Sequence, residues 1–147
     1  MISFLFIVAF CFNSFGQDDG FYQSDALKGD YKQVNAVVYV NVKGLKIVDS
    51  MGGDCENNKG TGYCLYELTA DVKEVFKGKA IGKTLKFYEV ADTDYPKAKL
   101  LGKQVVFLNK SELTITKTKE FFTLENSTRK IEFDIVSKLR KIKKSVR

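Results

Sequence analysis

The sequence predicts a mainly β protein, a small antiparallel barrel or sandwich of five to six strands with a short N-terminal helix and an amphipathic C-terminal helix. Segments rich in β-branched and aromatic residues recur over residues 34–124, with turn signals between them. No long helical pattern separates these segments, which favours antiparallel connections over a parallel sheet. Residues 129–147, in contrast, have helical periodicity.

Residues 1–16 have the features of a cleavable secretion signal. Residues 4–12 are continuously apolar, but a bilayer-spanning helix needs about 20 such residues. Ser14 and Gly16 place small residues at positions −3 and −1 of a cut before Gln17. No Lys or Arg precedes the apolar run, so a buried N-terminal strand or helix is the alternative. We expect a mature chain of residues 17–147 that is either secreted or retained in the periplasm or cell envelope. We expect no transmembrane segment in it.

The mature chain is expected to form one domain. Its length of about 130 residues suits a single hydrophobic core. A hydrophobic content of 44% excludes general disorder. No internal repeat, low-complexity tract or linker divides it.

The cysteines predict one disulfide. Of the three, Cys11 lies in the segment to be removed, which leaves Cys55 and Cys64. An even pair in an exported protein indicates a disulfide, here closing a Gly- and Asn-rich loop over residues 53–64. Such a bridge stabilises by about 2–3 kcal/mol. A metal site or a reactive thiol is the alternative, but structural zinc needs four ligands and the chain has no histidine.

The elements of the body follow in order. Residues 24–33 predict a short helix, and residues 34–43 a strand that residues 45–48 continue past a bulge at Gly44. Residues 63–76 alternate apolar and polar side chains, as in a strand with one buried face. Residues 84–90 and 103–109 are two further strands, joined by a long loop over residues 91–101. Residues 113–118 and 121–124 predict a hairpin that turns near Lys119 and Glu120.

Four of these segments carry a family resemblance: AVVYVNV at residues 36–42, VKEVFKG at 72–78, GKTL at 82–85 and GKQVVFL at 102–108. Together they resemble the bacterial relatives of the netrin-like module, the OB-type barrel of tissue inhibitors of metalloproteinases. The resemblance covers residues 34–109 and implies an OB-like barrel and a protein-binding role. In the family's inhibitors an N-terminal cysteine binds the protease zinc. The expected mature chain starts at Gln17, so the resemblance does not imply metalloproteinase inhibition.

The residue types argue against catalysis. The absence of histidine excludes Ser-His-Asp and Cys-His arrangements and histidine metal sites. Neither glycine-rich phosphate-binding motif is present. The acidic groups Asp92/Asp94 and Asp49/Asp54/Glu56 lack the spacing of a calcium loop and lie in segments typical of solvated loops. We expect no catalytic residue, no metal and no cofactor.

The formal charge of +6 resides in the tail. Residues 129–147 contain eight basic and two acidic residues, whereas residues 17–128 contain sixteen of each. An apolar stripe of Ile131, Ile135, Leu139, Ile142 and Val146 predicts a helix that docks on the core. Residues 130–135 also alternate, so the tail could begin as a strand. Its basic side could instead bind an anionic polymer, lipid or acidic protein, through Arg129, Lys130, Arg140, Lys141, Lys143, Lys144 and Arg147.

These observations predict an exported, non-catalytic binding module with a protein partner, of the inhibitor or accessory-factor type. The alternative is an envelope-associated protein whose basic helix binds anionic lipid or polysaccharide. Nucleic acid is not the expected partner, because the domain body is neutral and the chain is expected to be exported. The aromatic residues that could stack on bases sit on predicted strands, where such side chains usually form the core: Tyr39, Tyr66, Phe87, Tyr88 and Phe107.

Overall fold

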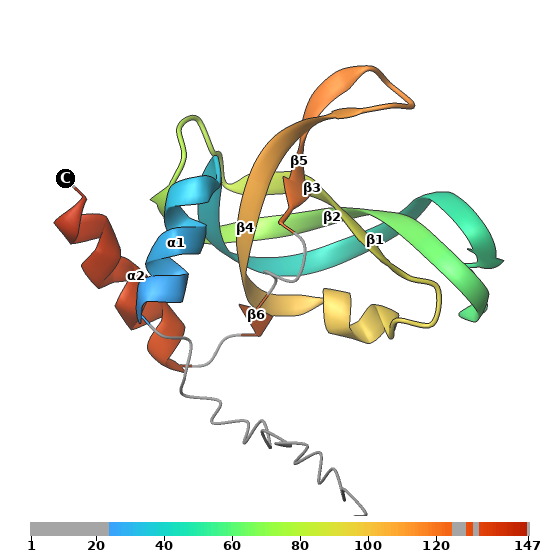
Figure 1. The fold of residues 1–147 in the computed structure, drawn as a ribbon, viewed down its shortest axis with the longest axis horizontal. Helices are drawn as coiled ribbons and strands as arrows, with labels where there is room; N and C mark the ends of the chain where they lie inside the picture. Colours follow the sequence, from blue (N-terminus) through green and yellow to red (C-terminus); the bar gives the residue numbers. More distant parts are fainter. Residues whose placement is uncertain (1–23, 125–128, 131–132, 147) are drawn as a thin grey trace, which may run out of the picture.

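The fold is a β-sheet that closes on itself, with both helices packed against one side of it (Figure 1). The computed structural model describes residues 24–124, 129–130 and 133–146. The expected signal, residues 1–16, lies outside the described residues. In chain order the elements are α1 (Ser24–Gln33), β1 (Ala36–Asp54), β2 (Lys59–Lys77), β3 (Thr84–Asp92), the short 3-10 helix η1 (Lys97–Leu100), β4 (Gly102–Leu113), β5 (Thr118–Thr123), β6 (Arg129–Lys130) and α2 (Phe133–Ser145).

Five strands form a ring in the order β1-β2-β3-β5-β4, and β4 pairs with β1 again. Four of the five neighbouring pairs are antiparallel, as expected, but β3 and β5 are parallel, with Tyr88 opposite Phe122. A purely antiparallel ring is therefore the wrong expectation. The reason is geometric, because an odd number of strands cannot alternate in direction around a closed ring.

The inner core fills this ring. Along β1 the residues Ala36, Val38, Val40 and Val42 point inward and are fully or almost fully buried. Period-two alternation on β2, β3 and β4 adds further inward side chains to the same cluster. These are Tyr66, Leu68, Ala70, Leu85, Phe87, Val106 and Leu108.

A second core lies outside the ring, between the sheet and the two helices. Its strand residues alternate with those of the inner core, which explains why residues 36–40 of β1 and 105–108 of β4 are continuously apolar. The Tyr31 hydroxyl on α1 donates to the carbonyl oxygen of Phe76, at 2.7 Å. The members of this second core are Leu27, Tyr31, Val34, Val37, Phe76, Val105, Phe107, Ile135, Leu139 and Ile142.

The expected docked helix in the tail is confirmed. Ile135, Leu139 and Ile142 are buried on α2, while Val146, past its end, is 60% exposed. Ile131 lies outside the described residues. The helix begins at Phe133 rather than near residue 129, because Arg129 and Lys130 pair with β4 as strand β6. The tail thus begins as a strand and continues as a helix.

β1 and β2 are each 19 residues long and continue, as an arm, past the segment in which β1 pairs with β4 (Figure 1). We define the arm as residues 45–54 and 59–68, where β1 pairs with β2 but no longer with β4. β3 pairs with β2 as far as Tyr63, so only the tip of the arm is two-stranded. The expected disulfide is confirmed, since Cys55 and Cys64 are bonded, with Cα atoms 5.9 Å apart. The expected loop over residues 53–64 is wrong, because only residues 55–58 form a turn and the glycines are accommodated within bulged strands.

The hairpin of β4 and β5 turns at residues 114–117, not near Lys119 and Glu120. Backbone N–H groups of Thr116 and Lys117 donate to the carbonyl oxygen of Leu113, at 3.2 and 2.7 Å. Lys117 adopts a φ of 54°, a left-handed conformation that is uncommon for a non-glycine residue. The turn therefore lacks a Gly or Asn signal, and the alternation of Leu113 and Ile115 misplaced it.

Candidate binding site

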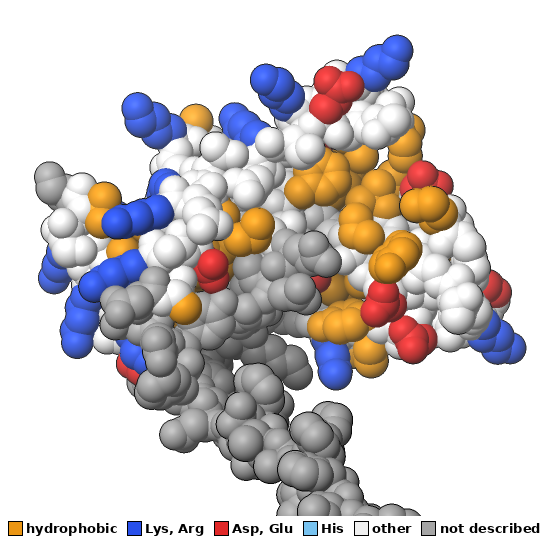
Figure 2. Space-filling model, in the orientation of Figure 1, with side chains coloured by type: hydrophobic (Ala, Val, Ile, Leu, Met, Phe, Trp, Pro, Cys, Tyr) orange, Lys and Arg blue, Asp and Glu red, His pale blue; other side chains and the backbone are white. Residues whose placement is uncertain are grey.

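An apolar groove, which no described residue covers, lies between the arm and the β4–β5 hairpin (Figure 2). Its volume is about 270 Å³. Segments from all five ring strands and from the β4–β5 turn contribute to it. The lining residues are Asp49, Ser50, Met51, Tyr63, Cys64, Leu65, Val90, Ser111, Glu112, Leu113, Thr114, Ile115 and Phe122.

Cross-strand pairing explains why apolar side chains gather on this face. Leu65 lies opposite Asp49 on one side and Val90 on the other, and Tyr63 lies opposite Met51. Partners across an antiparallel pair share a face of the sheet, so these residues face outward together. Cys64 alternates with them and is buried. The outward face of the arm therefore carries a row of apolar side chains.

A bulge in β1 turns the arm toward the groove. Ile47 lies opposite Tyr66, whose side chain is in the inner core, whereas Asp49 lies opposite the outward-facing Leu65. In a regular strand residues 47 and 49 would share a face. The extra residue between them, Val48, switches the alternation, so that Met51 reaches the groove instead of the core.

The exposure of the groove residues is high for their type. Met51 is 71% exposed, Val90 58%, Ile115 56% and Tyr63 54%. They come from four separate stretches of the sequence, and folding brings them to one hollow. Contiguous exposed apolar surface of this kind marks an interaction site more often than scattered apolar residues do.

The base of the groove is fixed by an aromatic contact at the junction of β3 and β5. The rings of Tyr88 and Phe122 are 5.4 Å apart, a distance typical of favourable aromatic pairs. The Tyr88 hydroxyl donates to Glu67 Oε2 at 2.8 Å. Burial, together with the hydrogen bond to Glu67, raises the pKa of Tyr88. Phe122 is thus held in place as part of the groove floor.

The tip of the arm is tied to the loop that follows β3. The backbone N–H of Thr93 donates to the carbonyl oxygen of Gly62 at 2.9 Å, and Lys97 Nζ donates to that of Glu56 at 2.8 Å. The side chain of Thr93 occupies the space above Gly53, where a Cβ atom would overlap it. With the disulfide, these contacts fix the tip of the arm against the loop after β3.

Carboxylates surround the groove. Asp49 on the arm and Glu112 on the hairpin are part of its lining, and no Lys or Arg of the described residues is. An adjoining hollow shares Tyr63 with the groove and is lined by Asp92 and Asp94. In Figure 2 acidic side chains lie beside the apolar patch on the same face. The groove therefore combines an apolar floor with an acidic rim.

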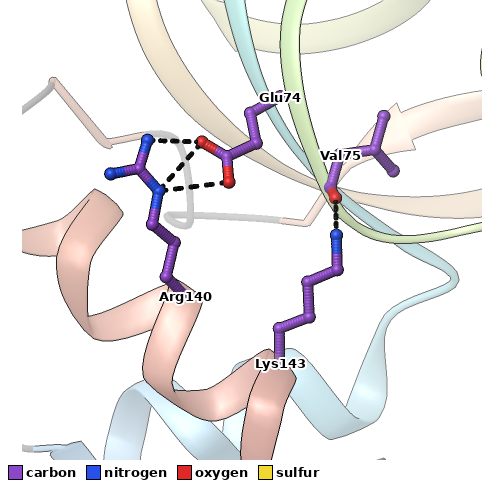
Figure 3. Close-up of polar contacts among 4 residues, drawn as sticks. All are labelled: Glu74, Val75, Arg140 and Lys143. Atoms are coloured by element: carbon purple, nitrogen blue, oxygen red, sulfur yellow. Dashed lines mark hydrogen bonds and ion pairs between the residues drawn. The ribbon is translucent and has the colours of Figure 1, made fainter.

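The basic residues predicted as an anionic-ligand surface are divided by the structure (Figure 3). Arg140 on α2 pairs with Glu74, with Nε and a terminal nitrogen 3.1 and 2.8 Å from Oε2. Lys143 Nζ donates to the carbonyl oxygen of Val75 at 2.6 Å. Both side chains thus hold α2 against β2, while Lys141 and Lys144 remain exposed. Arg129 and Lys130 form β6, which pairs with β4 and is not part of α2. Arg147 lies outside the described residues.

Sequence reasoning did not find the groove. The sequence predicts a solvated loop around Asp49 and a strand that ends at Val90. It does not indicate that the two residues converge. Isolated apolar residues such as Met51 and Ile115 are common in loops. Their convergence depends on the bulge at Val48 and on the hairpin turn, and neither has a sequence signal strong enough to find it.

Comparison with known proteins found no matching family model and no matching curated protein. Among the described residues, no helix has the length and apolar character required to span a bilayer.

Proposed function

We propose that this chain is an exported, non-catalytic binding module that holds a protein partner in the groove between the arm and the β4–β5 hairpin. The observation that carries the proposal is the convergence of four exposed apolar side chains on one hollow that no described residue covers: Met51, Tyr63, Val90 and Ile115. Export accounts for the apolar leader and fits the disulfide, which forms in oxidising compartments.

We also propose that the ring is an OB-type barrel of the netrin-like kind. Five strands that close in the order β1-β2-β3-β5-β4 support this assignment. OB-type barrels bind ligands on the face of strands 2 and 3, between the loops that join strands 1–2 and 4–5. The groove lies between the corresponding hairpins, with Tyr63 and Leu65 of β2 and Val90 of β3 in its lining.

The chemistry of the groove favours a protein over the other ligand classes of such barrels. Asp49 and Glu112 repel phosphates, which disfavours nucleic acid. The volume of about 270 Å³ lies just below the range of about 300–1,000 Å³ typical of pockets that bury whole small molecules. A few apolar side chains from a partner surface would fill it, as hot-spot residues do at protein interfaces.

The test is capture of partners from the producer's envelope and secreted fractions, with the full chain as bait. Val90→Asp and Ile115→Asp place a charge in the groove, and Val146→Asp is the matched control, because Val146 is as exposed but lies at the end of α2. We expect a partner that the wild type and the control retain and both groove variants lose. Circular dichroism verifies that every bait is folded. Equal retention by all four baits contradicts the proposal.

The alternative, an anionic lipid or polysaccharide bound by α2, has the exposed Lys141 and Lys144 in its favour. Their replacement by Gln distinguishes the two functions, since it removes charge without touching the groove. Binding that is lost with these lysines and at high salt, and kept by the groove variants, would favour the envelope function.

A further inference from the structure

We infer that the segment entering the groove is apolar and flanked by lysine or arginine, an inference that rests on the proposed function of the groove. The apolar floor by itself selects only for hydrophobic side chains. The distribution of charge around it adds a second requirement.

Carboxylates stand on both walls of the groove and at its end. Asp49 is on the arm wall and Glu112 on the hairpin wall. Asp92 lies opposite Tyr63 in the β2–β3 register, and therefore on the outward face that continues the groove. Asp94 follows in the adjoining hollow. A bound segment thus has acidic groups beside it on two walls and beyond one end.

None of the described lysines near this region lines the groove, although Lys117 is exposed on the turn that carries Ile115. Lys119 lies opposite Glu112 in the β4–β5 register but does not line the groove, and no ion pair within 4.0 Å joins the two in the described structure. Lys97 donates to a backbone carbonyl at the arm tip, and Lys110 lies over the ring of Phe121. A partner's cation therefore gains attraction here, whereas a partner's carboxylate or phosphate meets repulsion.

A random peptide library displayed on phage tests this inference against the full, disulfide-bonded chain. Counter-selection on Val90→Asp removes peptides that bind elsewhere. We expect the groove-dependent peptides to combine apolar residues with an excess of Lys and Arg, and to be depleted in Asp and Glu. Groove-dependent peptides with no basic excess overturn the inference but leave the proposed function standing. Failure to recover any groove-dependent peptide overturns both.

The rim is then tested directly with the best enriched peptide. Asp49→Asn and Glu112→Gln should each weaken its binding by about two- to fivefold, as expected for an exposed charge pair. Asp134→Asn is the matched control, because this carboxylate is exposed on α2 and pairs with Lys138 there. We expect the control to bind like the wild type. Unchanged affinity in both rim variants overturns the inference.

A second copy of this chain is the competing occupant, since its own α2 end offers Lys141, Lys144 and the exposed Val146. Sedimentation at increasing protein concentration separates the two. We expect a monomer at the concentrations used for peptide binding. Concentration-dependent association that Val90→Asp and Val146→Asp each abolish would assign the groove to self-assembly and overturn the inference.

Discussion

Two outward-facing surfaces of one sheet differ in what covers them. Around the first halves of β1 and β4, the outward residues Val37, Val105 and Phe107 are buried beneath α1 and α2. On the arm and β3, the outward residues Met51 and Val90 lie open to solvent. Both surfaces are apolar, but within residues 24–124, 129–130 and 133–146 the chain covers only one of them.

This difference separates residues that serve stability from residues that serve binding. A side chain beneath the helices contributes its buried area to folding, about 25 cal/mol per Å². A side chain in the groove has little buried area to lose when it is changed, and is free to contribute to a partner's interface. Substitutions in the two regions should therefore have opposite profiles of stability and binding.

The largest expected effect is at Leu139, which is fully buried on α2. Leu139→Ala should lower the free energy of unfolding by about 2–5 kcal/mol, because it leaves a cavity in the second core. Val90→Ala in the groove is the matched substitution and should change it by less than about 0.5 kcal/mol. Denaturant unfolding followed by circular dichroism measures both. Equal effects would remove the distinction between the regions.

Removal of the disulfide comes next. Replacing both Cys55 and Cys64 by Ala should cost about 2–3 kcal/mol, because it frees a short loop in the unfolded chain. The loss should appear first as faster amide exchange in the arm, with α1 and α2 still protected. Two free thiols in the denatured, exported wild-type protein would contradict this account.

The packing of the arm tip is tested at Gly53. Gly53→Ala forces the Thr93 side chain to move and should cost about 1–3 kcal/mol. The control is Gly29→Ala on α1, where a Cβ atom meets nothing within 4 Å. The control should stabilise the protein by about 0.5–1 kcal/mol, since Ala favours the helix. Thermal unfolding of the two variants decides whether they shift in opposite directions.

The Arg140–Glu74 pair should have a smaller effect. Its side chains are 58% and 28% exposed, so solvent screens the attraction. A double-mutant cycle with Arg140→Gln and Glu74→Gln should give a coupling of about 0.2–1 kcal/mol. A coupling that persists undiminished at high salt would show that the pair is more shielded than its exposure indicates.

The smallest expected effect is the pH dependence of the arm turn. Hydrogen bonds from the side chain and backbone of Asn57 lower the pKa of Asp54. A carboxylate with a lowered folded-state pKa stabilises above its unfolded pKa of about 3.9, and the contribution is lost as pH falls through the folded value. NMR shifts of residues 55–58 should therefore change at lower pH than those of an unstructured Asp. Titration at or above the ordinary value would contradict the hydrogen-bonded turn.

Sequence periodicity predicted the covered half of the molecule well. Ile135, Leu139 and Ile142 follow a helical stripe, and the valine-rich segment 34–43 predicts the strand that the structure places there as part of β1. These signals are strong because each element must bury its own apolar residues. The disulfide could be predicted as well, since removal of the expected signal would leave two cysteines to pair.

The uncovered half could not be predicted in the same way. The length of the arm depends on strands that tolerate Gly53, Gly60 and Gly62, residues that ordinarily indicate a loop. The groove requires a one-residue change of register at Val48, and such a change reverses which face a side chain occupies. Local sequence patterns carry almost no information about that register. The sequence therefore does not predict that Met51 and Val90 line the same groove.

The central claim is that a partner protein covers the open apolar groove, as α1 and α2 cover the other surface. Photo-cross-linking in the producing cells tests it most directly, with a photoactivatable amino acid at Met51 or at Val146. Both positions are exposed, at 71% and 60%, so they should be equally reactive toward solvent. We predict a discrete protein adduct from position 51 and none from position 146. An adduct from position 146 alone, or from neither position, would contradict the claim.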